Sequence, residues 1–169
     1  MAVCKGGENP DSIDVLVDEW QRERPDLDLS VIGCFARMKR FSAALGSMVH
    51  RVLERHGLNP GEFDVLATLR RAGPTHTLIP SQLSAALMTS RAGMTNRLDR
   101  LETAGLVERR LDPADRRSFQ VTLTEKGRKV IDEALTEHVE NVTRLLSCLS
   151  PEQRNNFDQA LRTLLNAIG

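Results

Sequence analysis

The stretch that most constrains the fold of this chain is residues 80–124, where the spacing of apolar residues changes from helical to alternating. Within residues 90–101, the apolar residues Ala92, Met94, Leu98 and Leu101 recur at the spacing of an amphipathic helix, after a shorter helix and a turn. Gly105 then fits the left-handed position that commonly ends a helix. Residues 106–110 and 118–123 alternate or are rich in strand formers, and a turn-like Asp-Pro-Ala-Asp run separates them. The stretch therefore predicts two helices followed by a β-hairpin.

This order of elements is typical of a winged helix-turn-helix, which places its second helix in a DNA major groove and the hairpin beside it. The candidates for groove contacts are short polar or guanidinium side chains early in that helix, namely Ser90, Arg91, Thr95 and Asn96. Near the hairpin tip, Arg116 and Arg117 are candidates for entering the minor groove or clamping phosphate. The alternative for each is a solvated polar face.

The charge of the chain supports this interpretation only locally. Its formal net charge is zero, so nothing in the overall composition indicates nucleic acid. Residues 88–117, however, contain seven arginines against five acidic residues, an excess of two positive charges on the elements proposed to touch DNA.

A longer set of motifs in this stretch resembles the MarR family of bacterial transcriptional regulators. The motifs are, in order, MTNRLDRLE (94–102), AGLV (104–107), Asp112-Pro113 with Asp115-Arg116-Arg117, and Leu123-Thr124 with Gly127. The resemblance implies a mainly α fold with a small β-wing and long terminal helices that form a homodimer. Two recognition helices related by two-fold symmetry would then read a pseudo-palindromic operator, and Asp115 would hold arginines of the wing or helix in place.

A narrower resemblance concerns the urate-responsive members, which carry an extra N-terminal helix with a tryptophan. The matching positions for a ligand site are Trp20, Asp64, Arg97 and Arg109. An indole face can stack on a planar purine while arginines pair with its anionic oxygens, and a nearby acid can respond to the bound anion. Such a site would couple the ligand to the recognition helix. The alternatives are that Trp20 is a packing anchor and that Asp64–Arg97 is a permanent salt bridge.

The rest of the chain is predicted to be helical around this unit. Residues 1–10 are expected to be a disordered lead-in. Residues 11–57 and 125–169 carry long apolar stripes at helical spacing, and we expect them to be dimerisation helices. Residues 59–124 are the winged helix-turn-helix, with a further short strand expected within 75–79. The whole, 1–169, is predicted to be a single MarR-like domain.

Helix boundaries are marked by capping patterns. Asn59-Pro60-Gly61-Glu62 and Ser150-Pro151-Glu152-Gln153 each combine an N-cap residue, proline at the first helical position, and an acid or amide able to reach back. Thr124 is expected to cap the long helix that follows the hairpin.

The cysteines and the absence of other motifs narrow the function. Cys4, Cys34 and Cys148 are odd in number and widely spaced, so a disulfide framework or zinc site is not expected; Cys34 is expected to be a buried thiol. We expect no metal or other cofactor and no catalytic set, hence no enzyme. Without a long apolar segment or signal-peptide core, no membrane association and a cytoplasmic location are expected.

These observations lead to one prediction and one alternative. The predicted function is that of a homodimeric DNA-binding transcriptional regulator. It would repress a pseudo-palindromic operator in double-stranded DNA and be released by a small anionic aromatic ligand such as urate. The alternative is an activator, or a redox-responsive regulator in which cysteine oxidation replaces the ligand.

Overall fold

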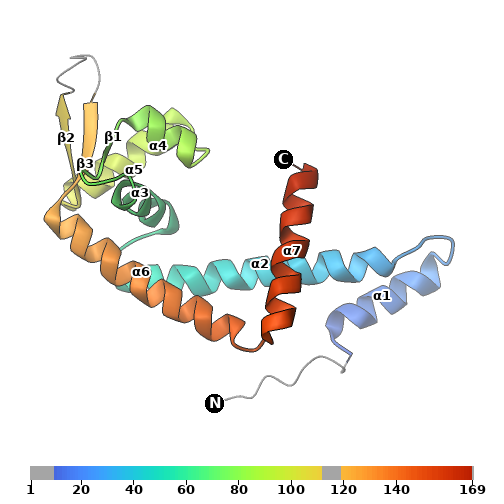
Figure 1. Cartoon of the computed structure of the whole chain (residues 1–169). Coiled ribbons are helices and arrows are strands. Elements are labelled where there is room, and N and C mark those ends of the chain that lie inside the picture. The colour runs from blue at the N-terminus through green and yellow to red at the C-terminus, as the bar shows by residue number, and fades with distance from the viewer. Residues whose placement is uncertain (1–9, 112–118, 169) are drawn as a thin grey trace. The chain divides into compact units, whose positions relative to one another are not determined.

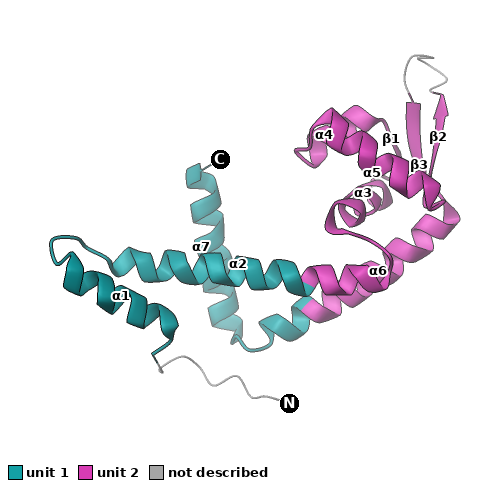
Figure 2. Cartoon of the chain, turned by 180° about the vertical axis from the view of Figure 1, so that it is seen from behind, with its two compact units in different colours: residues 1–48, 142–169 teal, residues 49–141 magenta. Residues whose placement is uncertain are grey.

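The computed structural model describes residues 10–111 and 119–168, which form mainly helices and a small antiparallel sheet (Figure 1). The chain divides into two compact units (Figure 2): unit 1 comprises residues 1–48 and 142–169, and unit 2 comprises residues 49–141. The mainly α fold class predicted from the sequence is confirmed. The prediction of a single domain stays a prediction.

Unit 2 contains the predicted helix-turn-helix and wing. Its complete elements are α3 (Pro60–Arg70), β1 (Thr77–Leu78), α4 (Pro80–Ala86), α5 (Arg91–Thr103), β2 (Val107–Leu111) and β3 (Phe119–Leu123). The central strand β3 pairs antiparallel with both β1 and β2. The short strand expected within residues 75–79 is therefore present, next to the hairpin rather than in it.

Local capping explains where the helices of unit 2 begin and end. The side chain of Asn59 accepts from the backbone N–H of Glu62, and the Glu62 carboxylate accepts from the N–H of Asn59, as the sequence predicts. Just after the C-terminal end of α5, Gly105 adopts φ 70°. This conformation favours glycine, because glycine lacks a Cβ. Thr124 caps the next helix, since its Oγ1 accepts from the N–H of Gly127.

The core of unit 2 lies between the three helices and the inner face of the sheet. Its fully buried side chains come from every one of these elements except β1, and from residues before α3 and after β3; they are Leu53, Val65, Leu66, Leu69, Leu83, Met94, Leu98, Leu101, Val107, Val121 and Ile131. Ala92, grouped with Met94 and Leu98 on the apolar face of α5, is exposed. That grouping was wrong because two residues span about 200° of helix, so Ala92 and Met94 lie on opposite sides.

Unit 1 is helical throughout its described part. Its helices are α1 (Ser12–Glu23), α7 (Pro151–Ile168), the first part of α2 (Ser30–Arg55) and the end of α6 (Glu125–Leu146). The cap predicted at Ser150 with Gln153 is present on α7, and Asp11 caps α1. None of the helices in the described part of the chain is long and apolar enough to cross a membrane.

Polar and aromatic contacts hold α2 to its neighbours within unit 1. Arg37 of α2 donates to both carboxylate oxygens of Asp11 at 3.0 Å and to Asp14 at 2.6 Å. A single guanidinium therefore binds two carboxylates at the N-terminus of α1. One turn further along α2, on nearly the same face as Arg37, the Phe41 ring packs edge-on against Phe157 of α7, with ring centroids 6.3 Å apart.

Cys34 is exposed, so the predicted burial of its thiol is not found in this chain. The reason is its position on α2. Helix α1 packs against the side that carries Gly33 and Arg37, and Cys34 lies about 100° further round the helix.

Replacing Arg37 by alanine is expected to loosen α1. Because Arg37 is the cation shared by Asp11 and Asp14, its loss leaves both carboxylates without their partner and the amides of residues 12–23 should exchange hydrogen about tenfold faster. Hydrogen exchange followed by mass spectrometry measures this directly. The matched control is Arg24→Ala, which removes an arginine paired only with nearby Asp26; equal exchange in the two variants would contradict the prediction.

The same contact has a defined pH dependence. The hydrogen bonds from Arg37 lower the pKa of Asp11 from its usual 3.8 to about 2. A carboxylate with a lowered folded-state pKa stabilises the folded form fully above the unfolded value, and this contribution is lost as pH falls through the folded value. In the wild type, the protection of the α1 amides relative to the unfolded chain should therefore be full above about pH 4, decrease as the pH falls below that value, and be lost towards pH 2.

Candidate nucleic-acid interface

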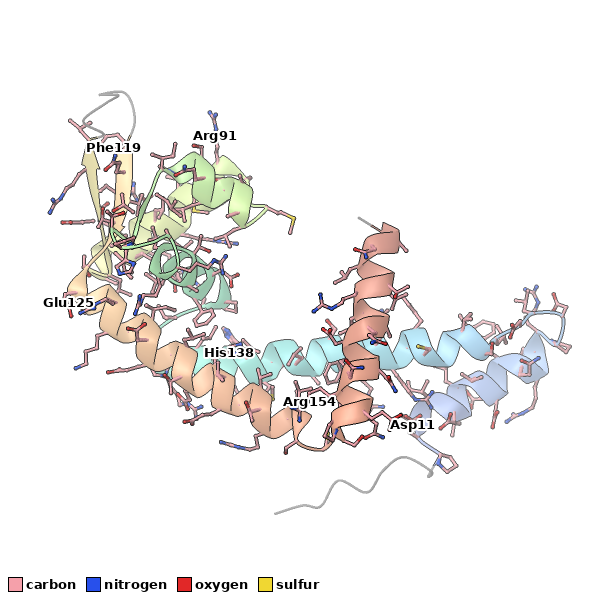
Figure 3. All side chains as sticks on the ribbon, in the orientation of Figure 1. Asp11, Arg91, Phe119, Glu125, His138 and Arg154 are labelled. Carbon is pink, nitrogen blue, oxygen red and sulfur yellow. The ribbon has the colours of Figure 1, made fainter. Side chains whose placement is uncertain are left out.

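Helix α5 is oriented by its apolar side. Met94, Leu98 and Leu101 are buried in the core of unit 2, so the residues on the other faces of the helix remain outside. The four predicted groove contacts, Ser90, Arg91, Thr95 and Asn96, are all exposed. In Figure 3, Arg91 points away from the body of unit 2. The helix thus presents its polar N-terminal half to solvent.

The four polar side chains differ in how free they are. Ser90 is the N-cap of α5 and its Oγ accepts from the N–H of Gly93 at 3.2 Å. The Thr95 hydroxyl donates to the carbonyl of Arg91 at 3.0 Å, leaving its lone pairs available. Among the described residues, neither Arg91 nor Asn96 makes a side-chain hydrogen bond. A guanidinium and an amide are the groups that read guanine and adenine most directly.

A buried carboxylate anchors α5 to α3. The side chain of Glu62 is 5% exposed, accepts from the N–H of Asn59 at 2.9 Å and pairs with Arg100 at 2.8 Å. Arg100 therefore forms an ion pair between the two helices. The sequence identifies Glu62 only as a capping residue; its second role depends on how the two helices pack.

The wing is tied to α5 through Arg109. This β2 side chain is only 23% exposed; its Nη2 donates to Asp99 at 2.5 Å and its Nε lies 3.3 Å from Glu102. Asp99 and Glu102 are three residues apart, on one face of α5, and together hold the strand beside the helix. Arg116 and Arg117, predicted to touch DNA, and Asp115, predicted to support them, lie outside the described residues.

The proposed ligand residues belong to both units. Trp20 is on α1 of unit 1 and is 53% exposed. In unit 2, Asp64 on α3 is exposed, and the Arg97 guanidinium lies against Gly61, where an added Cβ would come within 2.7 Å of Nε. The suggested Asp64–Arg97 salt bridge is not among the ion pairs formed by the described residues.

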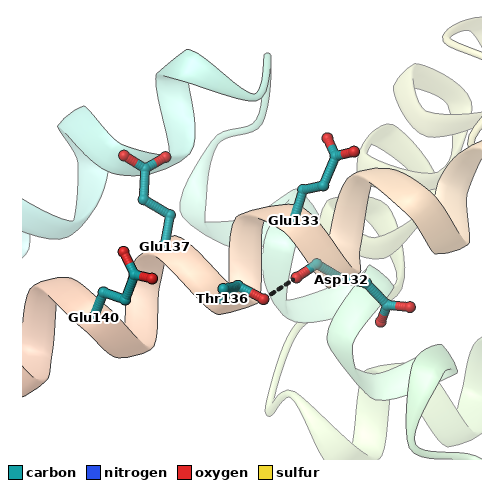
Figure 4. Close-up of a pocket in the computed structure, with 5 residues that line it drawn as sticks. All are labelled: Asp132, Glu133, Thr136, Glu137 and Glu140. Atoms are coloured by element: carbon teal, nitrogen blue, oxygen red, sulfur yellow. Dashed lines mark hydrogen bonds between the residues drawn. The ribbon is translucent and has the colours of Figure 1, made fainter.

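Acidic side chains gather on another part of unit 2, along α6. A shallow surface hollow of about 390 Å³ on α6 is lined by Thr136 and four acids, Asp132, Glu133, Glu137 and Glu140 (Figure 4). Two of these acids have partners on other helices: Asp132 pairs with Arg70 at 2.8 Å, and Glu137 pairs with His56 at 2.8 Å. An acidic surface of this kind repels a polyanion, so we do not expect it to contact DNA.

The sequence was compared with known proteins. Residues 56–118 match the MarR family. The chain is 39% identical over 153 residues to the HTH-type transcriptional regulator PecS of Dickeya dadantii (strain 3937), a match that covers 90% of each protein. This chain belongs to the MarR family. It is also 35% identical over 119 residues to the transcriptional repressor MprA of Escherichia coli (strain K12), covering 70% of this chain and 67% of that one.

Solved MarR structures show the same fold. AbsC from Streptomyces coelicolor superposes with a TM-score of 0.75 at 24% identity, covering 84% of this chain and 96% of that one. Sco3205 from the same organism, solved in complex with DNA, gives a TM-score of 0.75 at 23% identity, covering 85% and 94%. The predicted assignment is confirmed: the chain is a DNA-binding transcriptional regulator of the MarR family and not an enzyme.

Proposed function

We propose that this MarR regulator is a homodimeric repressor that binds a pseudo-palindromic operator and is released by a small anionic aromatic ligand, with urate as the leading candidate. The observation that supports it most is the exposed polar half of α5, where Arg91 and Asn96 keep their hydrogen-bonding groups free among the described residues. Ser90 and Thr95 flank them as further contacts, and Arg116 and Arg117 supply the wing contact in this proposal.

A second copy of the chain is the proposed partner of the apolar faces in unit 1. Large apolar side chains on α2 and α7 are exposed, among them Val31, Phe35, Met38, Leu164, Leu165 and Ile168. At roughly 25 cal/mol per Å², leaving these stripes in water is unfavourable. A two-fold dimer would cover them and would also present two copies of α5 to two half-sites about one helical turn apart.

The ligand site is proposed from side chains with suitable chemistry. The exposed indole of Trp20 is able to stack on a planar ring, and Arg97 and Arg109 are able to pair with its anionic oxygens, with Asp64 as the responding acid. Arg109 is already held by Asp99 and Glu102, so a ligand reaching it would have to compete with both. Because Arg97 is part of α5, any ligand that draws on it acts on the recognition helix itself.

The alternative, a redox-responsive regulator, is favoured by the exposure of Cys34 and Cys148; Cys4 lies outside the described residues. An accessible thiol is open to oxidation, whereas a buried one is shielded. In this version, mild oxidation abolishes DNA binding and a Cys→Ser change at the responsible position prevents the loss.

The proposal is tested by fluorescence anisotropy on the DNA upstream of the protein's own gene, with and without urate. We expect tight binding that urate reverses. Trp20→Ala should leave DNA affinity within about twofold while removing the response to urate, because a half-exposed side chain contributes little to stability.

The matched control is Leu16→Ala, which removes another exposed apolar side chain of α1 and should keep the response. Release by urate in Trp20→Ala would remove Trp20 from the site. Wild-type binding that urate does not change would retain the regulator and reject the ligand. Failure to select any duplex from a random pool would reject operator binding.

A further inference from the structure

The β-hairpin of the wing has one apolar face that continues past the core. Side chains alternate along a strand, so Val107, Arg109 and Leu111 of β2 share a face with their β3 partners. The first pair, Val107 with Leu123, is buried, and so is Val121 opposite Arg109. The outermost described pair, Leu111 with Phe119, is exposed, with accessibilities of 56% and 48%.

The other face of the hairpin is polar. It carries Glu108 and Arg110 on β2, with Gln120 and Thr122 opposite them on β3. In β3 the alternation of polar and apolar residues therefore runs unbroken to the outer end of the strand, and in β2 only Arg109 interrupts it, although the core beneath this face has already ended. Exposing a cross-strand pair of leucine and phenylalanine to water is unfavourable, so a binding partner that buries the pair would gain free energy.

The pair is continuous with the DNA-binding surface. The same hairpin face packs on α5 nearer the base of the wing, where Arg109 reaches Asp99 and Glu102. Figure 3 shows Phe119 and Arg91 at the same upper edge of unit 2, and Figures 1 and 2, seen from opposite sides, both show the hairpin extending upwards there. A duplex that lay along this edge, against the exposed half of α5, would reach this pair as well.

We infer that Leu111 and Phe119 are DNA contacts of the wing, which pack against deoxyribose and base edges in the groove beside the one that α5 occupies. This inference rests on the proposed operator binding. Phenylalanine and leucine are among the side chains that proteins place against minor-groove base steps, where they favour easily deformed sequences. An apolar contact of this kind adds affinity without neutralising phosphate, so it differs measurably from an arginine contact.

The test uses Phe119→Thr and Leu111→Thr, because threonine keeps strand propensity while removing apolar bulk. The full-length variants are titrated onto a labelled duplex selected from a random pool by the wild type, between about 50 and 200 mM salt. We expect each variant to bind about tenfold more weakly, as for losing part of a buried side chain, with an unchanged slope of affinity against salt.

Two control variants are measured in the same titration. Gln120→Thr, on the polar face of the same strand, should stay within about twofold of wild type. Arg91→Ala should reduce the salt slope by about one, as for a lost ionic contact. Wild-type binding in the same titration tests operator recognition separately from the wing contact.

Three outcomes overturn the inference. Unchanged affinity in both threonine variants would place the pair off the DNA. Weaker binding with a shallower salt slope would mean that the hairpin itself, with its arginines, had been lost. Weaker binding accompanied by dissociation in sedimentation velocity would mean that a second copy of the chain covers the pair.

Discussion

Gly127→Ala is expected to destabilise the fold by about 3 kcal/mol, because a methyl group at this position has no room. Gly127 lies in the first turn of α6, and a Cβ built on its backbone would stand 2.0 Å from the carbonyl oxygen of Leu106 and 3.0 Å from Leu123 Cδ1. The nearest atom is backbone, so no side-chain rotation relieves the clash. Leu106 also accepts from Thr124 at 3.1 Å, so the residue before the wing and the start of α6 move together.

Urea unfolding at fixed protein concentration measures this change, since stability of an assembling protein depends on concentration. The matched control is Gly46→Ala in α2, where an added Cβ meets nothing within 4 Å in the single chain. Alanine there should be neutral or stabilising by up to about 1 kcal/mol, because glycine is the poorer helix former. Equal stability of the two variants would show that α6 does not approach Leu106 this closely.

Phe35→Asp should reduce operator affinity about a hundredfold or more, the largest functional effect that we expect. Phe35 is 60% exposed on the apolar stripe of α2 that the proposed second copy covers. A carboxylate placed in that interface is desolvated without a partner and prevents association. A monomer engages only one half-site, so the gain from binding two half-sites as one molecule is lost.

Sedimentation velocity and anisotropy on the same preparations separate the two consequences. Ser47→Asp introduces the same charge at an exposed position on the opposite side of α2 and is expected to remain dimeric and bind normally. A dimeric Phe35→Asp variant would place the interface elsewhere. A monomeric variant with full operator affinity would contradict the proposal that two half-sites are bound together. It would still support the placement of the dimer interface on this face of α2.

The secondary structure was predictable because its signals are local. Asn59 with Glu62, Ser150 with Gln153, and Gly105 each act within one helical turn, and all three behave as their sequence context indicates. The exposed candidates on α5 follow from the same periodicity that buries Met94. Ala92 is exposed for the same local reason, because it lies about 200° round the helix from Met94.

The contacts between elements were not predictable in the same way. Nothing local to Glu62 reveals that its carboxylate reaches Arg100 on another helix, or that Arg109 is held by Asp99 and Glu102 rather than standing free. The alternation in the hairpin is visible in the sequence, but whether Leu111 and Phe119 are covered depends on where the core ends.

The sequence by itself determined the elements, their order, the MarR membership and the polar residues exposed on α5, because caps, periodicity and motif spacing are properties of neighbouring residues. The tertiary structure decided which charged groups are engaged and which apolar groups remain exposed. Arg100 and Arg109 are occupied, whereas Arg91 is free among the described residues. The physical reason is that ion pairing and burial depend on distances between segments far apart in the chain, and packing alone sets those distances.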